Sequence, residues 1–232
     1  MRKSISVVLP IYNEVKSLRY VIENWHFFLK KENFDHEFLL CEDGSSDGTK
    51  ELIVELCKQY PCINLSEEKR RGYGGGVLAG IFASSKTYIL CIDSDGQCMP
   101  NSFNKIYSMT ETNDIVIGER LPRNDPKIRI IYSKLFFGLF KLLFKTKIKD
   151  PSCPYVIAKK NIYLKLIPFL SYMKEGFWWG FIGAAIKLKL KIKDIPITHF
   201  KRYDGSTVVY KPSKMPSIII RNIIGMISLR LK

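Results

Sequence analysis

The sequence predicts an α/β fold with a mostly parallel central sheet flanked by helices. Short apolar runs rich in β-branched residues alternate with segments of helical periodicity along the first half of the chain, which is the order typical of a parallel sheet. Polar turns rich in Asp, Ser and Gly follow successive apolar runs, as expected where a strand is followed by a helix. With 232 residues, 46% of them hydrophobic, the chain is long enough for one sizeable domain with its own core.

The predicted elements follow one another in a regular order. The expected strands are 5–9, 38–41, 63–65, 88–92 and 115–118, and the expected helices are 15–30, one ending near 60 and one ending near 84. The strand segments are short and apolar, whereas the helical segments repeat their apolar residues every three or four positions. Because ligands gather at the carboxyl ends of parallel strands, we expect Tyr12, Asp43 and Asp93 to converge on one crevice.

The second half of the chain is basic and aromatic. Residues 120–129 are rich in Arg, Pro and Asp, and residues 130–149 mix Phe and Leu with Lys. From residue 216 the tail sets isoleucines among Arg and Lys residues. Basic amphipathic helices of this kind lie in the headgroup region of anionic bilayers, so we expect interfacial amphipathic helices toward the C-terminus. For the tail, a helix that docks on the protein core is an equally good interpretation.

Charge and cysteine content limit the function classes. A net charge of +15 favours nucleic acid, anionic lipid or phosphorylated ligands. The sequence carries no recognisable nucleic-acid-reading motif, so we expect no nucleic acid partner. The six cysteines lack C-x-x-C spacing, which favours a reducing, cytosolic environment. We expect no signal peptide, because only a handful of apolar residues precede Pro10. We also expect no membrane span, because no uncharged apolar run reaches about 18 residues.

Two carboxylates at the end of an apolar strand are the most informative feature of the chain. Asp93, Asp95 and Gln97 follow the run 88–92, and their alternating carboxylate and amide oxygens suit a hard cation such as Mg²⁺ or Mn²⁺ that holds a substrate diphosphate. An acidic turn is the better interpretation of an isolated D-x-D, and Asp43 alone is typical of a turn or helix cap. The glycines of 72–76 match neither a dinucleotide fingerprint nor a P-loop.

Several segments in sequence order share motifs with one enzyme family. They are 8–14 (VLPIYNE), 42–49 (EDGSSDGT), 71–76 with Gly80, 93–97 (DSDGQ), 118–120 (GER), Arg123, Arg129 with Ser133, 150–153 (DPSC) and the spacing H-x-x-R-x-x-G-x-T from His199 to Thr207. With these motifs the chain resembles family 2 glycosyltransferases of the GT-A (Rossmann-like) fold. It is most similar to the polyprenyl-phosphate glycosyltransferases related to dolichol-phosphate mannose synthase.

This resemblance implies an enzyme that moves a hexose from a GDP- or UDP-sugar, and it implies a role for each matching residue. The nucleotide sugar would be held by Pro10, Tyr12, Glu14, Asp43, Gly72 and Asp93. The divalent metal, Mg²⁺ or Mn²⁺, would be held by Asp93, Asp95 and Gln97. The acceptor phosphate would be held by Arg120, Arg129 and Ser133. Catalysis would depend on Asp95, Arg120, Arg129 and Arg202, the last adding positive charge at the diphosphate.

One departure from the family pattern bears on the acceptor. Relatives that act on hydroxyl groups place a carboxylate base on the helix before the last strand, but around 177–180 this chain has none except Glu175. A phosphate acceptor is already ionised and needs no base. We therefore expect inverting, metal-dependent transfer to a polyprenyl phosphate, with extension of a cell-surface saccharide as the alternative and a nucleic-acid-binding module as a less favoured one.

The expected organisation is a single GT-A domain over 1–232. Residues 1–119 would form the nucleotide-sugar-binding half, 120–210 the acceptor half and 211–232 an amphipathic C-terminal segment. Such a protein would be cytoplasmic and peripherally associated with the inner face of the membrane, where its partners would be a nucleotide sugar, a polyprenyl phosphate and the anionic membrane surface.

Overall fold

The chain is built around a seven-stranded sheet. The computed structural model describes residues 3–124, 127–173, 176–203 and 215–231, with the backbone alone for 127–129, 172 and 215–216. The strands are β1 Ser4–Ile11, β2 Asp35–Glu42, β3 Cys62–Asn64, β4 Tyr88–Cys91, β5 Ile115–Arg120, β6 Val156–Lys159 and β7 Ile192–Ile197. Their order is β3-β2-β1-β4-β6-β5-β7, and β6 alone runs antiparallel to its neighbours. The predicted mostly parallel sheet is confirmed.

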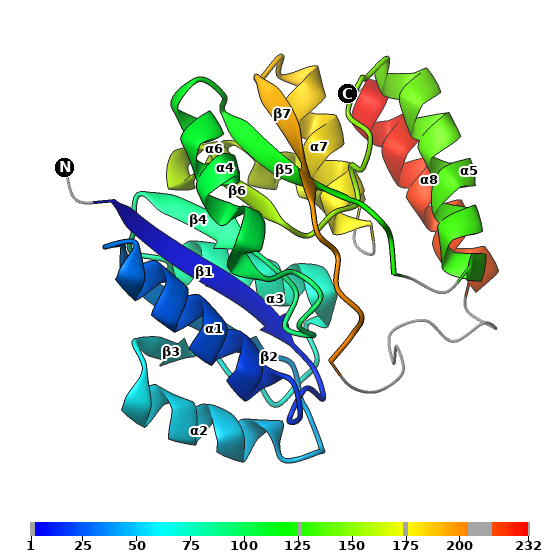
Figure 1. Ribbon diagram of the computed structural model, residues 1–232. Helices are drawn as coiled ribbons and strands as arrows, with labels where there is room; N and C mark the ends of the chain where they lie inside the picture. Colours follow the sequence, from blue (N-terminus) through cyan, green and yellow to red (C-terminus); the bar gives the residue numbers. More distant parts are fainter. Residues whose placement is uncertain (1–2, 125–126, 174–175, 204–214, 232) are drawn as a thin grey trace.

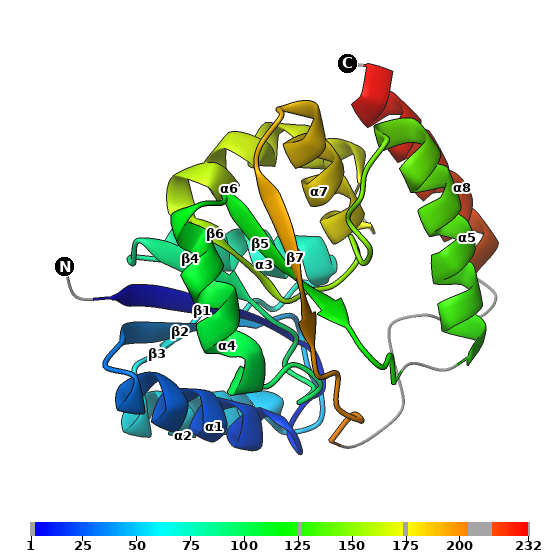
Figure 2. The same ribbon diagram turned by 45° about the horizontal axis from the view of Figure 1, so that its top comes forward.

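Helices pack on both faces of this sheet. They are α1 Leu18–Lys31, α2 Thr49–Gln59, α3 Gly72–Ala83, α4 Phe103–Ser108, α5 Lys127–Phe144, α6 Lys160–Leu166, α7 Phe177–Lys187 and α8 Met215–Leu231, with 3₁₀ turns η1 Pro100–Ser102, η2 Met109–Glu111 and η3 Ile167–Tyr172. Figure 1 shows α1 and α4 in front of the sheet and α3, α6 and α7 behind it. Helices α5 and α8 lie side by side against α7, as a turned view confirms (Figure 2).

The central strands are largely apolar because helices cover both of their faces. Val7, Val8 and Leu9 of β1 are all fully buried, the pattern of a parallel strand in the middle of a sheet. Helix α3 approaches β1 closely: a Cβ at Gly80 would lie only 2.4 Å from Val8 Cγ1 and 2.9 Å from Cys41 Sγ. The glycine-rich segment is therefore the first half of a tightly packed helix.

Strand pairing brings three polar turns to one edge of the sheet. In the parallel pairs, Ile11 lies opposite Glu42 and Val8 lies opposite Cys91. The segments that follow β1, β2 and β4 therefore leave the sheet as neighbours. These are the segments that carry Tyr12, Asp43 and Asp93, and their convergence was expected from the sequence.

Helix α8 docks on the protein core, which is one of the two interpretations that the sequence left open for the tail. Met226 and Leu229 are fully buried against the core, whereas Ile220 and Ile224 are each 58% exposed. One face of the helix docks on the protein, and another presents apolar side chains to the outside. Among the described residues, no helix is both long and apolar enough to cross a bilayer.

Candidate active site

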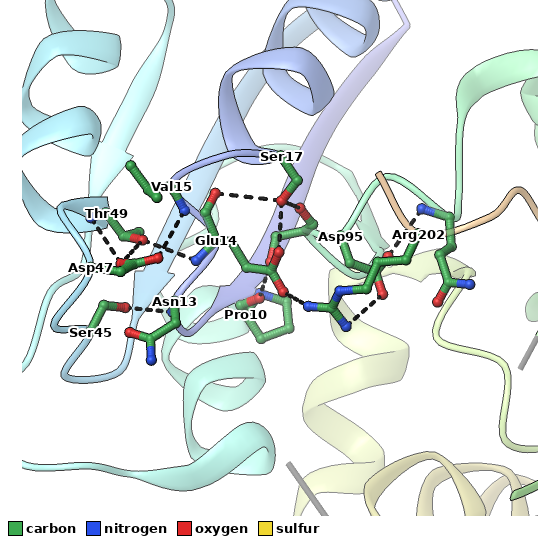
Figure 3. A network of polar contacts seen from close by, with 12 residues as sticks. Pro10, Asn13, Glu14, Val15, Ser17, Ser45, Asp47, Thr49, Asp95 and Arg202 are labelled. Atoms are coloured by element: carbon green, nitrogen blue, oxygen red, sulfur yellow. Dashed lines mark hydrogen bonds and ion pairs between the residues drawn. The ribbon is translucent and has the colours of Figure 1, made fainter. Parts of the chain in front are cut away.

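The turns that follow β1 and β2 are joined by hydrogen bonds (Figure 3). The Asn13 N–H donates to Ser45 Oγ (2.9 Å), and the Glu14 N–H donates to Thr49 Oγ1 (3.0 Å). Asn13 has a φ of +56°, a left-handed conformation that Asn tolerates better than most residues. The segment that carries Tyr12 is thereby held against the segment that follows Asp43.

Asp43 is buried, and both of its carboxylate oxygens accept main-chain hydrogens from the start of α3. The Arg71 N–H donates to Oδ1, and the Gly72 N–H donates to Oδ2 at 3.0 Å. The Arg70 guanidinium stacks 3.7 Å from the centroid of the Tyr12 ring and lies 3.6 Å from Asp43 Oδ2. The structure brings the predicted residues Tyr12, Asp43 and Gly72 together and adds Arg70, which the sequence did not single out.

The D-x-D turn after β4 is held against the end of β1. The Ser94 hydroxyl donates to the carbonyl oxygen of Pro10 at 2.8 Å. Asp95 is 7% exposed, and its Oδ1 accepts the Gln97 N–H at 3.0 Å. Pro10, near the end of β1, thus lies against the turn that carries Asp93, Asp95 and Gln97.

Asp93 has an aromatic hydrogen-bond partner. Its Oδ1 accepts the hydroxyl of Tyr73 at 2.9 Å, and this hydroxyl accepts the indole N–H of Trp178 at 2.7 Å. Burial and the adjacent charge of Asp93 hold the pKa of Tyr73 well above its ordinary value, so the hydroxyl keeps its proton. Sequence reasoning missed both aromatic residues, because 105 positions separate Tyr73 from Trp178.

Arg202 contacts two carboxylates (Figure 3). Its Nη2 pairs with Glu14 Oε1, and its Nη1 lies 3.5 Å from Asp95 Oδ2. Burial raises the pKa of Glu14, although a hydrogen bond from Ser17 and the charge of Arg202 oppose the shift. A cation between the two acidic side chains shows that they converge on a point where positive charge is favourable.

Residues 199–203, here called the strap, cross the D-x-D turn. The Phe200 N–H donates to Gln97 O (3.0 Å), and Gln97 Nε2 donates to Phe200 O (3.1 Å). The Tyr203 N–H donates to Asp95 O (3.1 Å), and the Tyr203 ring stacks on Tyr20 with 4.7 Å between centroids. These bonds place the Gln97 side chain against the strap and hold Arg202 over the turn.

The chemistry of this turn fits a hard divalent cation. Asp93, Asp95 and Gln97 offer the carboxylate and amide oxygens that Mg²⁺ and Mn²⁺ prefer, and the Arg202 guanidinium already stands as a cation beside Asp95. Within the described ranges, no three His, Cys, Asp or Glu side chains converge at metal-ligand spacing. Mg²⁺ sites in general take one or two carboxylates from the protein and complete their coordination with water and substrate phosphates.

A cavity of about 480 Å³ lies between the end of β5 and the first half of α5. Cationic, acidic and apolar side chains share its lining, which comprises Glu119, Arg120, Leu121, Arg123, Ile130, Ser133, Lys134, Phe137, Lys149, Asp150, Pro151 and Trp179. The cations outnumber the acids by four to two. Phe137 and Trp179, with ring centroids 6.5 Å apart, form an aromatic side that the sequence did not predict for this site.

The charged groups of this cavity are held in defined positions. Arg120 donates to Asp150 through Nε (2.7 Å) and Nη2 (2.8 Å), and the two side chains are buried. Burial opposes the charge of Asp150, but hydrogen bonds and positive charge from Arg120 hold its pKa below the ordinary value. Arg123 Nη1 donates to Ser133 Oγ at 2.9 Å, and Lys149, whose side chain is 65% exposed, pairs with Glu119 Oε2 at 3.1 Å.

Some predicted residues fall outside the described part of the structure. The backbone of Arg129 belongs to α5, but its side chain is not described, and Glu175, Gly205 and Thr207 lie outside the described ranges. In the closing segment, His199 is buried and its Nδ1 accepts the Asn124 N–H at 3.1 Å.

Comparison with known proteins identifies the family. A profile described as "Glycosyl transferase family 2" matches residues 6–166. The chain belongs to this family. The predicted enzyme class, a glycosyltransferase, is confirmed, and so is the resemblance to its polyprenyl-phosphate members.

Relatives of this family 2 glycosyltransferase carry names of that subgroup. Human dolichyl-phosphate beta-glucosyltransferase is 34% identical over 228 residues, which covers 89% of the chain and 70% of the relative. The enzyme of the same name from Dictyostelium discoideum is 28% identical over 223 residues, which covers 87% of the chain and 68% of the relative. Undecaprenyl-phosphate 4-deoxy-4-formamido-L-arabinose transferase from Yersinia enterocolitica is 30% identical over 163 residues, which covers 69% of the chain and 50% of the relative.

Solved structures resemble the whole of this glycosyltransferase. Glucosyl-3-phosphoglycerate synthase from Mycobacterium tuberculosis, in complex with Mn²⁺, UDP-glucose and phosphoglyceric acid, superposes with a TM-score of 0.71 at 17% identity and covers 98% of the chain and 80% of the synthase. Mannosyl-3-phosphoglycerate synthase from Rubrobacter xylanophilus gives a TM-score of 0.68 at 12% identity, with 99% and 74% covered. At this identity the likeness concerns the fold, and it confirms the expected GT-A architecture.

Proposed function

We propose that this family 2 glycosyltransferase moves a hexose from a nucleotide sugar to a polyprenyl phosphate in a metal-dependent reaction with inversion. The cavity beside β5 carries the proposal, because it combines cations for a phosphate with aromatic and aliphatic side chains for a lipid. The names of the dolichyl- and undecaprenyl-phosphate relatives support the same acceptor class. The four cations of the lining favour a phosphate over the alternative acceptor, a growing saccharide.

In the proposed donor half, residues 1–119, the nucleotide sugar lies at the carboxyl ends of β1, β2 and β4. Pro10, Tyr12, Glu14, Asp43, Gly72 and Asp93 would hold it, and Asp93, Asp95 and Gln97 would hold Mg²⁺ or Mn²⁺. The ion, when bound, supplies positive charge that neutralises the departing nucleoside diphosphate. Arg202 adds further charge there, which its position beside Asp95 supports.

In the proposed acceptor half, residues 120–210, the acceptor phosphate binds in the cavity. Arg120, Arg129 and Ser133 contact it, as the family resemblance implies. Arg123, which donates to Ser133, and the exposed Lys149 add positive charge. A phosphate monoester is already ionised near neutral pH, so its oxygen attacks the anomeric carbon without a general base. The bond from that carbon to the diphosphate breaks on the opposite face, and the products are a glycosyl polyprenyl phosphate and a nucleoside diphosphate.

Exposed apolar side chains near the cavity support peripheral binding to a membrane. On α5, Ile131 is 53% and Leu135 69% exposed, next to the cavity residues Ile130 and Lys134. Helix α8, which lies beside α5 (Figure 2), exposes isoleucines in the same way. Lysines between apolar residues favour an anionic surface. These features support our proposal that the enzyme binds peripherally to the cytosolic face of the membrane, where an anionic surface and a polyprenyl phosphate acceptor would be available.

The proposed reaction is tested with purified protein, radiolabelled UDP-glucose, Mn²⁺ and undecaprenyl phosphate in detergent micelles. UDP-glucose is the first donor to try because a structural neighbour was crystallised with it. We expect label in the organic extract that mild acid releases, and no label with EDTA or with Asp95→Asn. Label transferred only to 3-phosphoglycerate or to a saccharide would contradict the proposed acceptor.

A pair of cation variants tests whether the cavity binds the acceptor. Arg123→Ala should raise the KM for undecaprenyl phosphate about tenfold or more, because a charge-assisted phosphate contact is lost, while the KM for UDP-glucose stays unchanged. Arg19→Ala, which removes an exposed cation from α1, is the control and should change neither constant. If Arg123→Ala raised the KM for UDP-glucose as much as the KM for undecaprenyl phosphate, Arg123 would not belong to the acceptor site.

A further inference from the structure

Three side chains from distant segments form a directed chain of hydrogen bonds that ends on Asp93. Trp178 lies in the first turn of α7, Tyr73 in the first turn of α3, and Asp93 two residues after the end of β4. An indole N–H can only donate and an ionised carboxylate can only accept. The Tyr73 hydroxyl, which has one hydrogen, therefore accepts from Trp178 (2.7 Å) and donates to Asp93 (2.9 Å).

The donor at the start of this chain is rigidly placed. Trp178 is 5% exposed and contacts Phe177 and Phe181 edge to face, with centroid distances of 5.0 and 5.5 Å. Helix α7 in turn packs closely on the α5–α8 layer, because a Cβ at Gly183 would lie 3.0 Å from Leu229. The indole nitrogen thus has one position relative to the sheet.

We propose that Tyr73 and Trp178 are positioning residues for Asp93, acting on metal and donor binding through this carboxylate. Partners of ligating carboxylates orient them toward the ion. A hydrogen bond to an ionised group is stronger than a neutral one, and the Trp178 N–H polarises the hydroxyl that makes it. The inference rests on the proposed function, since it assigns Asp93 to the metal and donor site.

A purely structural role would satisfy the same hydrogen bonds, because buried indole and phenol groups need partners wherever they lie. Tyr163 distinguishes the two roles. It is fully buried, and its hydroxyl donates to Val156 O at 2.9 Å and lies beside the Cys91 thiol of β4. Tyr163→Phe therefore removes a buried tyrosine hydroxyl near the same strand without removing a bond to Asp93. It is therefore the matched control for Tyr73→Phe.

The experiment measures Mn²⁺ binding by EPR titration and UDP binding in saturating Mn²⁺ by calorimetry, with Tm recorded for each variant. Tyr73→Phe should weaken Mn²⁺ binding about 10- to 100-fold and weaken UDP binding with it. Both Tyr→Phe variants should lower Tm similarly, by about 2–4 °C. Tyr163→Phe should keep the Mn²⁺ affinity of the unaltered protein.

The role of Trp178 is tested by combining substitutions. Trp178→Phe should weaken Mn²⁺ binding in the same direction but less than Tyr73→Phe. The double variant should bind Mn²⁺ as Tyr73→Phe does, because Trp178 acts through the hydroxyl that is already absent.

The outcomes separate this inference from the proposed function. Mn²⁺ affinity within twofold of the unaltered protein in Tyr73→Phe, or an equal loss in Tyr163→Phe, would overturn the positioning role alone. If the unaltered protein binds no Mn²⁺, the metal-dependent function fails, and the positioning role fails with it.

Discussion

Asp150→Asn tests how strongly the buried ion pair beside the cavity stabilises the protein. The Arg120 and Asp150 side chains are only 5% and 9% exposed, and two short hydrogen bonds join them. Removing one charge from such a pair costs about 3–5 kcal/mol because the other charge stays desolvated. Asparagine keeps one acceptor oxygen, so we expect the lower end, about 3 kcal/mol at pH 7.

Urea unfolding followed by circular dichroism measures this loss. For a chain of this size, a loss of about 3 kcal/mol corresponds to a Tm lower by about 6–12 °C. Asp35→Asn is the control: Lys86 Nζ lies 2.9 Å from Asp35 Oδ2, but these side chains are 23% and 44% exposed, so the expected loss is about 1 kcal/mol or less. If Asp150→Asn lost no more stability than Asp35→Asn, the reasoning from burial would be refuted.

The same pair gives a pH dependence with a defined sign. The pKa of Asp150 is held below its ordinary value of 3.8, so its charged form stabilises the folded state. This contribution is complete above the ordinary value and is lost as the pH falls through the lower folded-state pKa. The difference in unfolding free energy between the unaltered protein and Asp150→Asn should therefore narrow below about pH 4.

Two further substitutions test packing and charge. Gly80→Ala places a Cβ 2.4 Å from Val8 Cγ1, so α3 must move away from β1, and urea unfolding should show a loss of about 1–3 kcal/mol. Arg202→Gln removes the cation 3.5 Å from Asp95 Oδ2. Without nucleotide, its Mn²⁺ affinity in EPR titration should rise about three- to tenfold, because two cations no longer repel each other at one carboxylate, while sugar transfer slows.

Matched controls accompany both substitutions. A Cβ at Gly138 in α5 meets no atom within 4 Å, so Gly138→Ala should stabilise the protein by about 0.5–1 kcal/mol; the same gain in Gly80→Ala would contradict the close helix–strand contact. Arg19→Gln removes an exposed cation that pairs with Glu55 and should leave Mn²⁺ binding unchanged. Weaker Mn²⁺ binding in Arg202→Gln would show that the strap supports the ion instead of competing with it.

The sequence predicted the α/β class, the order of the first strands and helices, and the turns that carry the candidate donor residues. Each of these depends on residues close together in the chain: the spacing of apolar side chains decides helix or strand, and Asp, Ser and Gly mark the turn between them. The antiparallel strand β6, Val156–Lys159, was not predicted, because an apolar run this short, followed directly by helix α6, does not distinguish a strand from the start of that helix.

Only the tertiary structure decided how distant side chains pair and which side of the C-terminal helix is buried. Arg120 meets Asp150 from 30 residues away, and Trp178 meets Tyr73 from 105 residues away. Such contacts depend on how whole elements pack, which no local pattern encodes. In α8, isoleucines occur around most of the helix, so periodicity did not identify the docking side; contact with α5 and α7 buries Met226 and Leu229 and leaves Ile220 and Ile224 exposed.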